Sequence, residues 1–552
     1  MQALLVATVL GIAAGSDPIQ LSPRDLFNSF EARRVVLEKH DSRLTLDPRV
    51  WKYDVERQGV VTTDPIELGP REGSIAADAQ INAVKIELAA KVPAGSSISM
   101  ETRSGSNRFS EQQWSKWQKV AGLQCKVDPL AGRYLQVRLT LRAKSEEAVP
   151  AITGLKLQPT ISNSKPWKGT LTLTNWDRPA FVRGSIPFHY ERPDNPALAR
   201  FRKAARLDNV VAGATDDFDK LVRLMDWVGS GSNKRGFAWA EGTSEPYPWD
   251  IDRLLEIQPD SKLVVKGHCM SYAIALVSAA TALGYPARHW AIEGFRDMDH
   301  EVAEIWVPNL KKWVYFDPSL TTYYFDEKTK VPLSVLELHQ IVARRFLQPG
   351  EDMNWWHQEH SVATRARVRQ VGGKTGVGCR LGQWNYGKPM SADYDWGWNH
   401  GYLACGFIQL TPRNDFHSNP KAASKVFGAA KRLTADAYPF WVDDQTPPYQ
   451  DEHGCATNWY TRARDFYWTP DTGAVEFWKL SEGVVRVELG NTMSFFREYR
   501  ISIDDGPAKS TATPLTWKLH AGRNRLHVVP VDEFGKTGAA NTVVLEYQAE
   551  LD

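Results

Sequence analysis

The sequence predicts a multidomain α+β protein in which a core of helices and strands is flanked by two β-sandwich domains. At 552 residues the chain is long enough for three or four domains. Segments that alternate apolar and polar residues recur near both ends of the chain, as strands of sandwiches do. Between them lie an amphipathic helical pattern and a long apolar stretch, which indicate a mixed core.

The composition is that of a globular protein and excludes several classes. Hydrophobic residues make up 42% and charged residues 24% of the chain, which argues against a disordered, collagenous or coiled-coil protein. Lys and Arg number 67, and Asp and Glu number 65, giving a net charge of +2. This near-balance, without a long basic run, provides no electrostatic footprint for nucleic acid, so we expect no nucleic-acid partner.

Residues 1–16 are predicted to be a signal peptide. Residues 3–14 form one apolar run, and small residues follow it before Asp17. The run has the length of a secretory signal, whereas a membrane span takes about 20 residues. No Lys or Arg precedes the run, and a buried N-terminal helix is the alternative. We therefore expect a secreted or periplasmic protein without a membrane anchor.

Residues 17–52 are predicted to be an N-terminal helical segment, because residues 23–41 have the pattern of a short amphipathic helix. Residues 53–160 are predicted to form a β-sandwich, with half-buried strands near 66–68, 83–88, 97–102, 134–141 and 152–157. The stretches 104–120 and 131–145 resemble jelly-roll, galactose-binding-like modules. That resemblance implies either a sugar-binding domain or an inert spacer.

The middle of the chain is predicted to be a linker followed by the core domain. Residues 161–186 contain several Pro, Gly and Trp residues and are assigned to the linker, and residues 187–345 to the core. An amphipathic helix is predicted over about 216–228, and Gly229 and Gly231 are expected to end it. Its apolar side comprises Phe218, Leu221, Val222, Leu224, Met225 and Val228.

Two further segments follow the core. Residues 346–475 are predicted to be a Trp-rich extension that packs on the core, and residues 476–552 an immunoglobulin-like β-sandwich. The aromatic side chains of the extension either fill an irregular interior, which is favoured, or line a sugar-binding cleft. The aromatic tract extends over 354–478 and includes Trp355, Trp356, Trp384, Trp396, Trp398, Trp441, Trp459, Trp468 and Trp478.

The most informative stretch is 266–320. Cys269 begins a run that is apolar or small on nearly every face, and Gly284 and Pro286 close it. The pattern predicts a buried helix with Cys269 in its first turn. Unpaired backbone N–H groups and the positive end of the helix dipole lower the pKa of a thiol at that position. The Cys269 N–H can also donate to a developing oxyanion.

Three strands are predicted after this helix, over about 287–293, 300–307 and 313–317. The second strand starts at His300 and the third ends at Asp317. If these two strands pair antiparallel, the Asp317 carboxylate lies beside the His300 ring. It then fixes the tautomer so that the other ring nitrogen can take a proton from Cys269, which is the arrangement of an acyl-transfer triad.

Two stretches also carry a resemblance to a known family: GHCMSYAIALVSAATALGYPARHW and DHEVAEIWVPNLKKWVYFDPSL. They resemble the transglutaminase-like superfamily, whose members share a papain-like core. The resemblance covers about 187–324 and implies Cys269 as nucleophile, His300 as base and Asp317 as the orienting acid. The family often has Trp two residues after the histidine, and this sequence has Val302 there.

The resemblance suggests further site residues. Family enzymes can use an upstream Trp or Gln as a second oxyanion donor, which implies Trp239 or Trp249, and spacing does not choose between them. His268, His289 and Glu304 are candidates for the substrate pocket. Packing is the favoured role of His289, and His268 is expected to point to a different helix face from Cys269.

Five cysteines are present, and four of them can pair in an oxidising compartment. Disulfide connectivity among Cys125, Cys379, Cys405 and Cys455 is not readable from the sequence. The chain contains no CxxC, HExxH or calcium-binding motif. We therefore expect neither a metal site nor a cofactor.

These features predict a secreted cysteine-dependent acyl-transfer enzyme that hydrolyses an amide or peptide bond through a thioester intermediate. The expected substrate is a protein, peptide or glycoconjugate, with a cell-wall peptide among the candidates, and carbohydrate is a further expected partner. Two alternatives stay open. One is a protein cross-linker that uses an amine acceptor, and the other is an inactive transglutaminase-like protein that binds carbohydrate at a cell surface.

Overall fold

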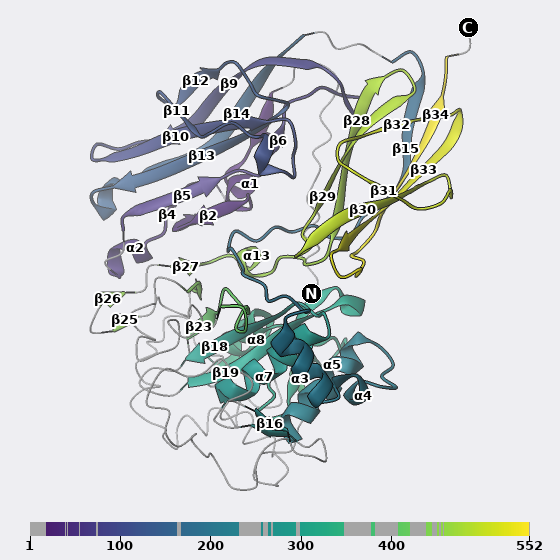
Figure 1. The fold of residues 1–552 in the computed structure, drawn as a ribbon. Coiled ribbons are helices and arrows are strands. Elements are labelled where there is room, and N and C mark those ends of the chain that lie inside the picture. Colours follow the sequence, from purple (N-terminus) through teal and green to yellow (C-terminus); the bar gives the residue numbers. More distant parts are fainter. Residues whose placement is uncertain are drawn as a thin grey trace. The chain divides into compact units, whose positions relative to one another are not determined.

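The computed structural model describes most of the chain: residues 18–230 (apart from 39, 41, 54–55, 73–74 and 163–166), 255–257, 263–265, 269–293, 299–346, 377–380, 407–419, 438–443, 450–451, 454–455 and 458–550. The chain divides into two compact units. The first comprises Met1–Ser185 and Trp468–Asp552, and the second comprises Ile186–Tyr467. Within the described residues the first unit is mostly strand, whereas the second combines a sheet with helices (Figure 1).

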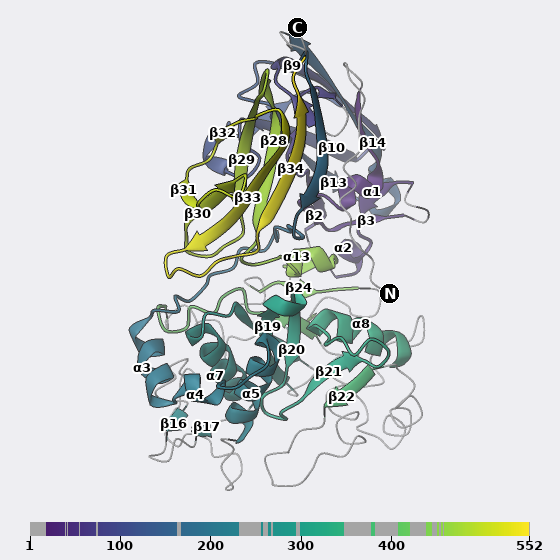
Figure 2. The ribbon, with the colours of Figure 1, turned by 90° about the vertical axis from the view of Figure 1, so that its right-hand side faces the viewer.

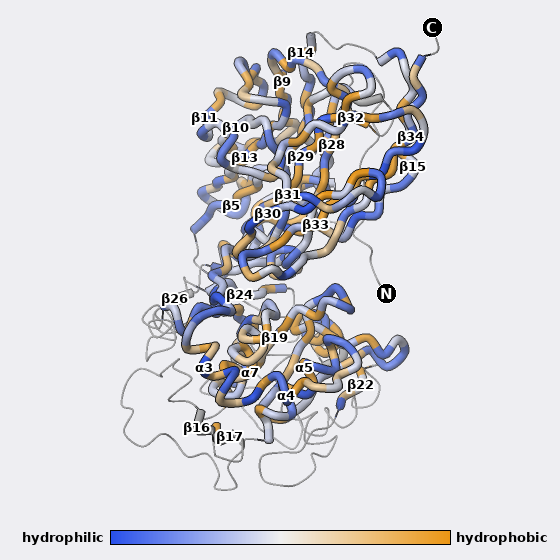
Figure 3. Tube along the Cα trace, turned by 45° about the vertical axis from the view of Figure 1, so that its right-hand side comes forward, coloured by the Kyte–Doolittle hydropathy of each residue, from blue (hydrophilic) through white to orange (hydrophobic). Residues whose placement is uncertain are grey.

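The first unit contains an N-terminal β-sandwich, as the sequence predicted. One sheet has the order β12-β9-β14-β4-β3 with β1 on β14, and the other has the order β11-β10-β13-β5-β2 with β6 on β13. Apolar and polar residues alternate along these strands (Figure 3), and Ile86, Met100 and Leu139 belong to the shared core. The strands of the first sheet are β1 (Ile19–Leu21), β3 (Val35–Leu37), β4 (Leu44–Leu46), β9 (Gln80–Lys91), β12 (Gln124–Val127) and β14 (Ala151–Ser162). Those of the second are β2 (Glu31–Arg33), β5 (Gln58–Thr62), β6 (Ile66–Glu67), β10 (Ser96–Gly105), β11 (Gln118–Val120) and β13 (Tyr134–Ala143).

The prediction of a helical segment over 17–52 is wrong for most of its length. Its described helices are only α1 (Pro23–Phe27) and α2 (Arg49–Lys52). A capping box between Ser22 and Asp25 starts α1. Beyond it, β2 pairs with β5 of one sheet and β3 with β4 of the other, so the segment supplies strands to both sheets of the sandwich. Their β-branched and apolar residues gain more from this pairing than from a longer helix.

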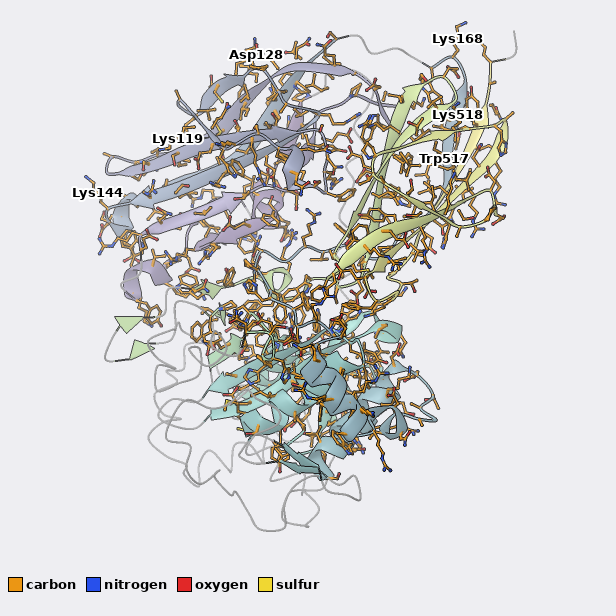
Figure 4. The ribbon with its side chains drawn as sticks, in the orientation of Figure 1. Lys119, Asp128, Lys144, Lys168, Trp517 and Lys518 are labelled. Carbon is orange, nitrogen blue, oxygen red and sulfur yellow. The ribbon has the colours of Figure 1, made fainter. Side chains whose placement is uncertain are left out.

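A second β-sandwich completes the first unit. Its sheets have the orders β15-β34-β33-β30-β31 and β32-β29-β28-β8-β7. Trp517 lies in the core of this sandwich and the next residue, Lys518, is exposed (Figure 4). The first sheet contains β15 (Thr170–Asp177), β30 (Phe496–Ile503), β31 (Lys509–Thr511), β33 (Gly522–Asp532) and β34 (Asn541–Gln548). The second contains β7 (Arg71–Glu72), β8 (Ile75–Ala77), β28 (Gly473–Ser481), β29 (Val484–Asn491) and β32 (Leu515–Lys518).

Three strands of this second sandwich come from much earlier in the chain. The predicted linker, 161–186, contains β15, which pairs antiparallel with β34. Residues 71–77, predicted to belong to the N-terminal sandwich, form β7 and β8, and β8 pairs in parallel with β28. Leu171 and Leu173 of β15 pack against the core of the second sandwich. These pairings correct the predicted domain boundaries.

Side chains also join the two sandwiches of the first unit. A loop of the N-terminal sandwich carries Arg108 and Phe109 to strands β28 and β29. Arg108 Nη1 lies 2.5 Å from Glu476 Oε1, and the Arg108 backbone N–H donates to Glu488 Oε2 at 3.3 Å. The Phe109 ring lies so close to Gly490 that a Cβ at that glycine would be 2.2 Å from it. The sandwiches therefore pack together without room for a side chain at this point.

The second unit is built around a six-stranded sheet with the order β20-β19-β18-β23-β24-β27. Its pairings are antiparallel except that of β24 with β27. Helices α3, α5 and α7 lie together beside the sheet (Figure 2). The sheet strands are β18 (Ala287–Glu293), β19 (Asp299–Val307), β20 (Lys312–Phe316), β23 (Phe407–Leu410), β24 (Phe440–Trp441) and β27 (Trp459–Tyr460). The main helices are α3 (Pro196–Ala204), α5 (Asp217–Ser230), α7 (Cys269–Ala282) and α8 (Val335–Phe346).

Helix α7 is the buried helix that the sequence predicted. Every residue from Met270 to Ala282 is buried. The helix contacts α3 and α5, and it also contacts strands β18 and β19. A helix that is covered on several sides needs apolar or small residues on nearly every face, and this explains its composition. Gly284, with a φ of 85°, follows its end.

The described part of the Trp-rich extension continues the sheet of the second unit through β23, β24 and β27. Trp441 and Trp459 are buried there, and the Trp441 ring packs edge-on against Phe466 with 5.9 Å between centroids. For these two tryptophans the structure agrees with the packing interpretation. Trp478 belongs to β28 of the second sandwich instead. Outside the described residues lie Trp355, Trp356, Trp384, Trp396 and Trp398.

Candidate active site

Cys269 is the first residue of α7, where the sequence predicted it. Its side chain is half-buried and is present as a thiol. The first backbone N–H groups of a helix have no acceptor within the helix, and the helix dipole is positive at this end. Both effects favour a thiolate over a thiol.

The hairpin of β19 and β20 brings His300 and Asp317 together. The two strands pair antiparallel, with Ala303 opposite Phe316. The start of β19 therefore lies beside the end of β20, and His300 Nε2 is 2.6 Å from Asp317 Oδ2. An ionised carboxylate only accepts hydrogen bonds, so Nε2 carries the proton. This leaves Nδ1 as the nitrogen that can exchange a proton with a nucleophile.

Cys269 lies next to the His300 ring. A hydrogen bond with the Cys269 side chain is among the contacts that raise the pKa of His300. The three predicted triad residues thus form one continuous line, from the start of α7 through the start of β19 to the end of β20. They come from elements separated in sequence but adjacent in this unit.

The charge state of His300 is set by opposing effects. Burial, the largest, disfavours the imidazolium, but the Asp317 carboxylate and the Cys269 side chain together outweigh it and hold the pKa of His300 well above its usual value. The ring is 12% exposed, so solvent contributes little. An imidazolium beside a thiolate is the resting form of an activated cysteine.

Asp317 is fully buried, and four hydrogen bonds compensate its carboxylate. Besides the bond from His300, Oδ1 accepts from Ser319 Oγ at 2.7 Å, from Ser319 N–H at 3.0 Å and from Leu320 N–H at 3.1 Å. Burial raises the pKa of Asp317, but the charge of His300 and these hydrogen bonds lower it below its usual value. Asp317 therefore stays ionised at neutral pH and can orient a charged His300.

Ser319 and Leu320 are not among the site residues predicted from the sequence. A signal for them exists, because Asp and Asn side chains commonly accept a hydrogen bond from the N–H two residues further on. The Asp-Pro-Ser sequence at 317–319 is such a case, and Ser319 adds its hydroxyl to the same carboxylate oxygen.

Glu304, predicted as a pocket residue, lies in the interior. It is fully buried, and Oε2 is 2.8 Å from Arg288 Nε and 2.7 Å from Trp290 Nε1. Its other oxygen accepts from the Val335 N–H at 2.8 Å and from the Tyr467 hydroxyl at 3.0 Å. The protein itself occupies both oxygens, and this corrects the assignment of Glu304 to a substrate-facing wall.

His289 is likewise enclosed by protein. It is fully buried, with Nδ1 2.8 Å from Thr411 Oγ1 and Nε2 2.7 Å from Glu301 Oε2. These contacts agree with the packing role that was favoured for His289 and correct its place among the pocket candidates. The other candidates, His268, Trp239 and Trp249, lie outside the described residues.

The described part of the chain also shows which metal ligands and cysteine thiols are available. There, no group of three or more His, Cys, Asp or Glu residues is arranged to hold a metal ion. Cys125 and Cys379 are present as thiols. Cys405 and the side chain of Cys455 fall outside the described residues, so the predicted disulfide pairing stays a prediction. None of the helices in the described ranges combines the length and the apolar character that a bilayer span requires.

The site lies in a segment that matches a known family. Residues 204–318 match the transglutaminase-like superfamily, and this range contains Cys269, His300 and Asp317. The protein is therefore a multidomain, mostly-β chain that carries a transglutaminase-like core among several antiparallel sheets. No curated protein sequence matches the chain.

Several solved structures are distantly similar to the chain. Red sea bream transglutaminase is 9% identical and the match covers 90% of this chain and 96% of that one, with a TM-score of 0.17. A xylan-binding module from Roseburia intestinalis is 15% identical over 26% of this chain and 96% of its own, with a TM-score of 0.16. A glycosylation-associated protein complex from Streptococcus agalactiae is 8% identical over 29% of this chain and 50% of its own, with a TM-score of 0.14. These scores establish no shared fold, so the assignment of the core comes from the family match.

Proposed function

We propose that the protein is a cysteine-dependent acyl-transfer enzyme that hydrolyses an amide or peptide bond through a thioester intermediate. The observation that carries the proposal is the line from Cys269 through His300 to the buried, ionised Asp317. A thiolate at a helix start, an imidazole that holds its proton and a carboxylate that fixes the ring are the parts that acyl transfer requires.

The reaction proceeds in two halves. The Cys269 thiolate attacks the substrate carbonyl carbon, and the Cys269 backbone N–H at the start of α7 donates to the oxyanion that forms. When the tetrahedral intermediate collapses, the C–N bond breaks and His300 gives its proton to the departing amine, leaving a thioester. His300 then takes a proton from water, the resulting hydroxide attacks the thioester, and the acid product leaves as the thiolate and imidazolium are restored.

Water is the proposed acceptor, because it is the default acceptor unless the site excludes it. An amine that attacks the same thioester would instead form a new amide and cross-link two molecules. The two outcomes share every step up to the thioester, so only the acceptor separates them.

The proposed setting is outside the cytoplasm, and the proposed substrate is a peptide of a glycoconjugate or of a cell wall. The apolar run at 3–14, which is typical of export, supports the setting. The presence of two β-sandwiches in the same chain as the core supports an extended substrate, since such modules often accompany enzymes that act on polymers. Export is tested by whether the N-terminus of the protein, when isolated from its host, begins after residue 16.

The central test compares the protein with its Cys269→Ala variant on casein and on a labelled peptide, with and without a fluorescent primary amine. Release of fragments supports hydrolysis, and incorporation of the amine supports cross-linking. We expect the variant to lose activity by about 10⁴-fold or more, as removal of a catalytic nucleophile does. Activity that survives in Cys269→Ala contradicts the proposal.

A second measurement needs no substrate. Iodoacetamide should label Cys269 faster than Cys125, whose pKa is raised by burial and which therefore serves as an internal reference. Peptide mapping by mass spectrometry distinguishes the two thiols. Equal rates would favour an inactive relative of the family.

Carbohydrate binding by the N-terminal sandwich is a second candidate function. Trp114 and Trp117 are half-buried, and the guanidinium carbons of Arg138 and Arg103 lie 4.0 Å and 4.7 Å from the Trp117 ring centroid. Aromatic rings that lie next to guanidinium groups in this way can contact a sugar as well as the neighbouring arginines. Titration of Trp fluorescence with soluble polysaccharides tests the idea: a response that is lost in Trp117→Ala supports it, and no response in the unchanged protein contradicts it.

A further inference from the structure

The loop that follows β20 closes tightly around the Asp317 carboxylate. The Asp317 N–H donates to Thr322 O at 2.9 Å, and the Thr322 N–H donates to Asp317 O at 3.0 Å. Within the loop, Ser319 donates its hydroxyl to Asp317 Oδ1. Thr321 has a φ of 53°, a left-handed conformation that is rare for a β-branched residue. Such a conformation persists only where the surrounding structure holds it.

Helix α5 packs against Thr321 at Gly229 and so restrains its left-handed conformation. A Cβ at Gly229 would lie 2.0 Å from Thr321 Cγ2 and 2.8 Å from Pro318 O, so the helix touches both the strained residue and the loop backbone. The sequence predicted that Gly229 and Gly231 end the helix; α5 includes Gly229 and extends to Ser230. Because glycine weakens a helix interior relative to alanine, close approach to the loop is the physical reason for glycine here.

We propose that Gly229, Thr321 and Ser319 are positioning residues of the Cys269–His300–Asp317 triad. The contact between Gly229 and Thr321 fixes the backbone of the loop 317–322. That loop, together with the Ser319 hydroxyl, fixes the side chain of Asp317 and hence its distance to His300. This inference rests on the proposed function, because it assigns these residues a part in the same thiol chemistry.

The contacts form a short mechanical path. From Gly229 the path passes to Thr321, then through the closed loop to the Asp317 carboxylate, and across 2.6 Å to the His300 ring. All of these residues except His300 are buried, so protein atoms pack around them on most sides. A change at Gly229 must therefore be absorbed by the loop or by the helix.

The first test is Gly229→Ala, with Ser230→Ala as the matched control. Ser230 is the next residue of α5 and is exposed, so its truncation leaves the loop contact unchanged. We expect Gly229→Ala to lower kcat on casein by roughly 10- to 100-fold with little change in KM, since displacing a catalytic group by about 1 Å costs on the order of 100-fold. The pH midpoint for alkylation of Cys269 by iodoacetamide should also rise, because a more distant carboxylate favours the imidazolium less.

Three further variants separate positioning from general destabilisation. Ser319→Ala removes the hydroxyl and adds no bulk, and it should change kcat and the alkylation profile in the same direction; Ser319→Thr keeps the hydroxyl and should restore both. The double variant Gly229→Ala with Thr321→Gly removes the methyl that the new Cβ would meet and relieves the left-handed strain. It should recover part of the activity, because Pro318 O still lies close to residue 229.

The inference is overturned if folded Gly229→Ala and Ser319→Ala proteins have the kcat and the alkylation profile of the unchanged protein. If Gly229→Ala does not fold, the same measurements on Ser319→Ala and Ser319→Thr decide whether the inference holds. Failure of the proposed function looks different, because Cys269 of the unchanged protein would then react no faster than Cys125. In that case NMR titration of the His300 ring decides on positioning: a lower midpoint in Ser319→Ala supports it, and an equal midpoint overturns it.

Discussion

At the scale of single residues, the site depends on a carboxylate that is buried and yet charged. Moving an ion of this size out of water costs several kcal/mol, which only a counter-charge and good hydrogen bonds can offset. Asp317 has both, with His300 on one oxygen and Ser319 and Leu320 on the other. The left-handed conformation of Thr321 adds a cost of about 1–3 kcal/mol, which the packing around the loop must supply.

Asp317→Asn tests the charge of this residue. The substitution nearly preserves shape, but it removes the negative charge that raises the pKa of His300. The pKa of His300 should therefore fall, so the imidazolium is lost at a lower pH and the alkaline edge of the active range moves down. We also expect kcat to drop by about 10³- to 10⁴-fold. Measurement of kcat on casein across pH checks both, and an alkaline edge that does not move contradicts the role of the charge.

A site residue could be predicted from the sequence where the pattern that marks it lies close to it in the chain. Cys269, His300 and Asp317 could be predicted because each stands at the boundary of an element with its own pattern. Ser319 was not predicted because the signal for it, the short Asp-Pro-Ser turn at 317–319, is weak on its own. Glu304 was misassigned because its position in the sequence does not reveal its buried partner Arg288, which lies opposite it on β18.

At the scale of elements, strand β19 contributes two residues to buried carboxylate interactions, and the two interactions have different roles. Its start places His300 beside Asp317, whereas Glu304 in its middle ties the sheet to its neighbours. Glu304 pairs with Arg288 of β18 and accepts from the backbone at the start of α8 and from the Tyr467 hydroxyl. The guanidinium of Arg288 also lies 4.0 Å from the Trp313 ring centroid. This cluster holds the strand on which His300 lies.

Glu304→Gln should therefore destabilise the second unit strongly. The substitution leaves the Arg288 charge buried without its counter-charge, and loss of one partner of a buried ion pair costs about 3–5 kcal/mol. Urea unfolding followed by Trp fluorescence measures the change. As the control, Asp208→Asn removes one partner of the solvent-exposed pair with Arg202 and should cost no more than about 1 kcal/mol. Equal effects of the two substitutions would contradict the importance of the buried cluster.

The elements themselves were predictable where pattern and partner lie close together. The alternation of β9, β10, β13 and β14 predicted strands, and the apolar run of α7 predicted a buried helix. The segment after Phe27 was misread as helix because apolar spacing in short edge strands can imitate a helical face. The sheets to which β8 and β15 belong were not predictable, since their partners, β28 and β34, lie hundreds of residues further along the chain.

At the scale of the whole molecule, the two sandwiches of the first unit meet at a pair of like charges. Glu476 of β28 and Glu488 of β29 are directly opposite each other. Arg108 from the N-terminal sandwich contacts both, through its side chain and its backbone N–H respectively. Burial, with Glu476 adding to it, raises the pKa of Glu488 to about 7 despite nearby arginines. The junction of the sandwiches therefore contains a carboxyl group that titrates near neutral pH.

The free energy of unfolding of the first unit should fall as pH rises. Glu488 binds its proton more tightly in the folded state, where its pKa is about 7, than in the unfolded state, where its pKa is near 4.5. The stability that this proton contributes is therefore present below pH 4.5, is lost as the pH rises from 4.5 to 7, and is gone above about 7. The range corresponds to about 3 kcal/mol at most. Glu488→Gln should remove this dependence and stabilise the unit at pH 8 in urea unfolding. Glu498→Gln, at a partly exposed site of the same sandwich, is the control and should leave the pH dependence intact.

The early origin of β8 and β15 also constrains when the first unit can fold. β8 pairs with β28 and β15 pairs with β34, and both partners are synthesised hundreds of residues later. Until then they are unprotected strand edges, which readily pair with the wrong chain. Folding of this unit during synthesis therefore stays incomplete until β28 and β34 are made, and a nascent chain should depend on holding chaperones until then.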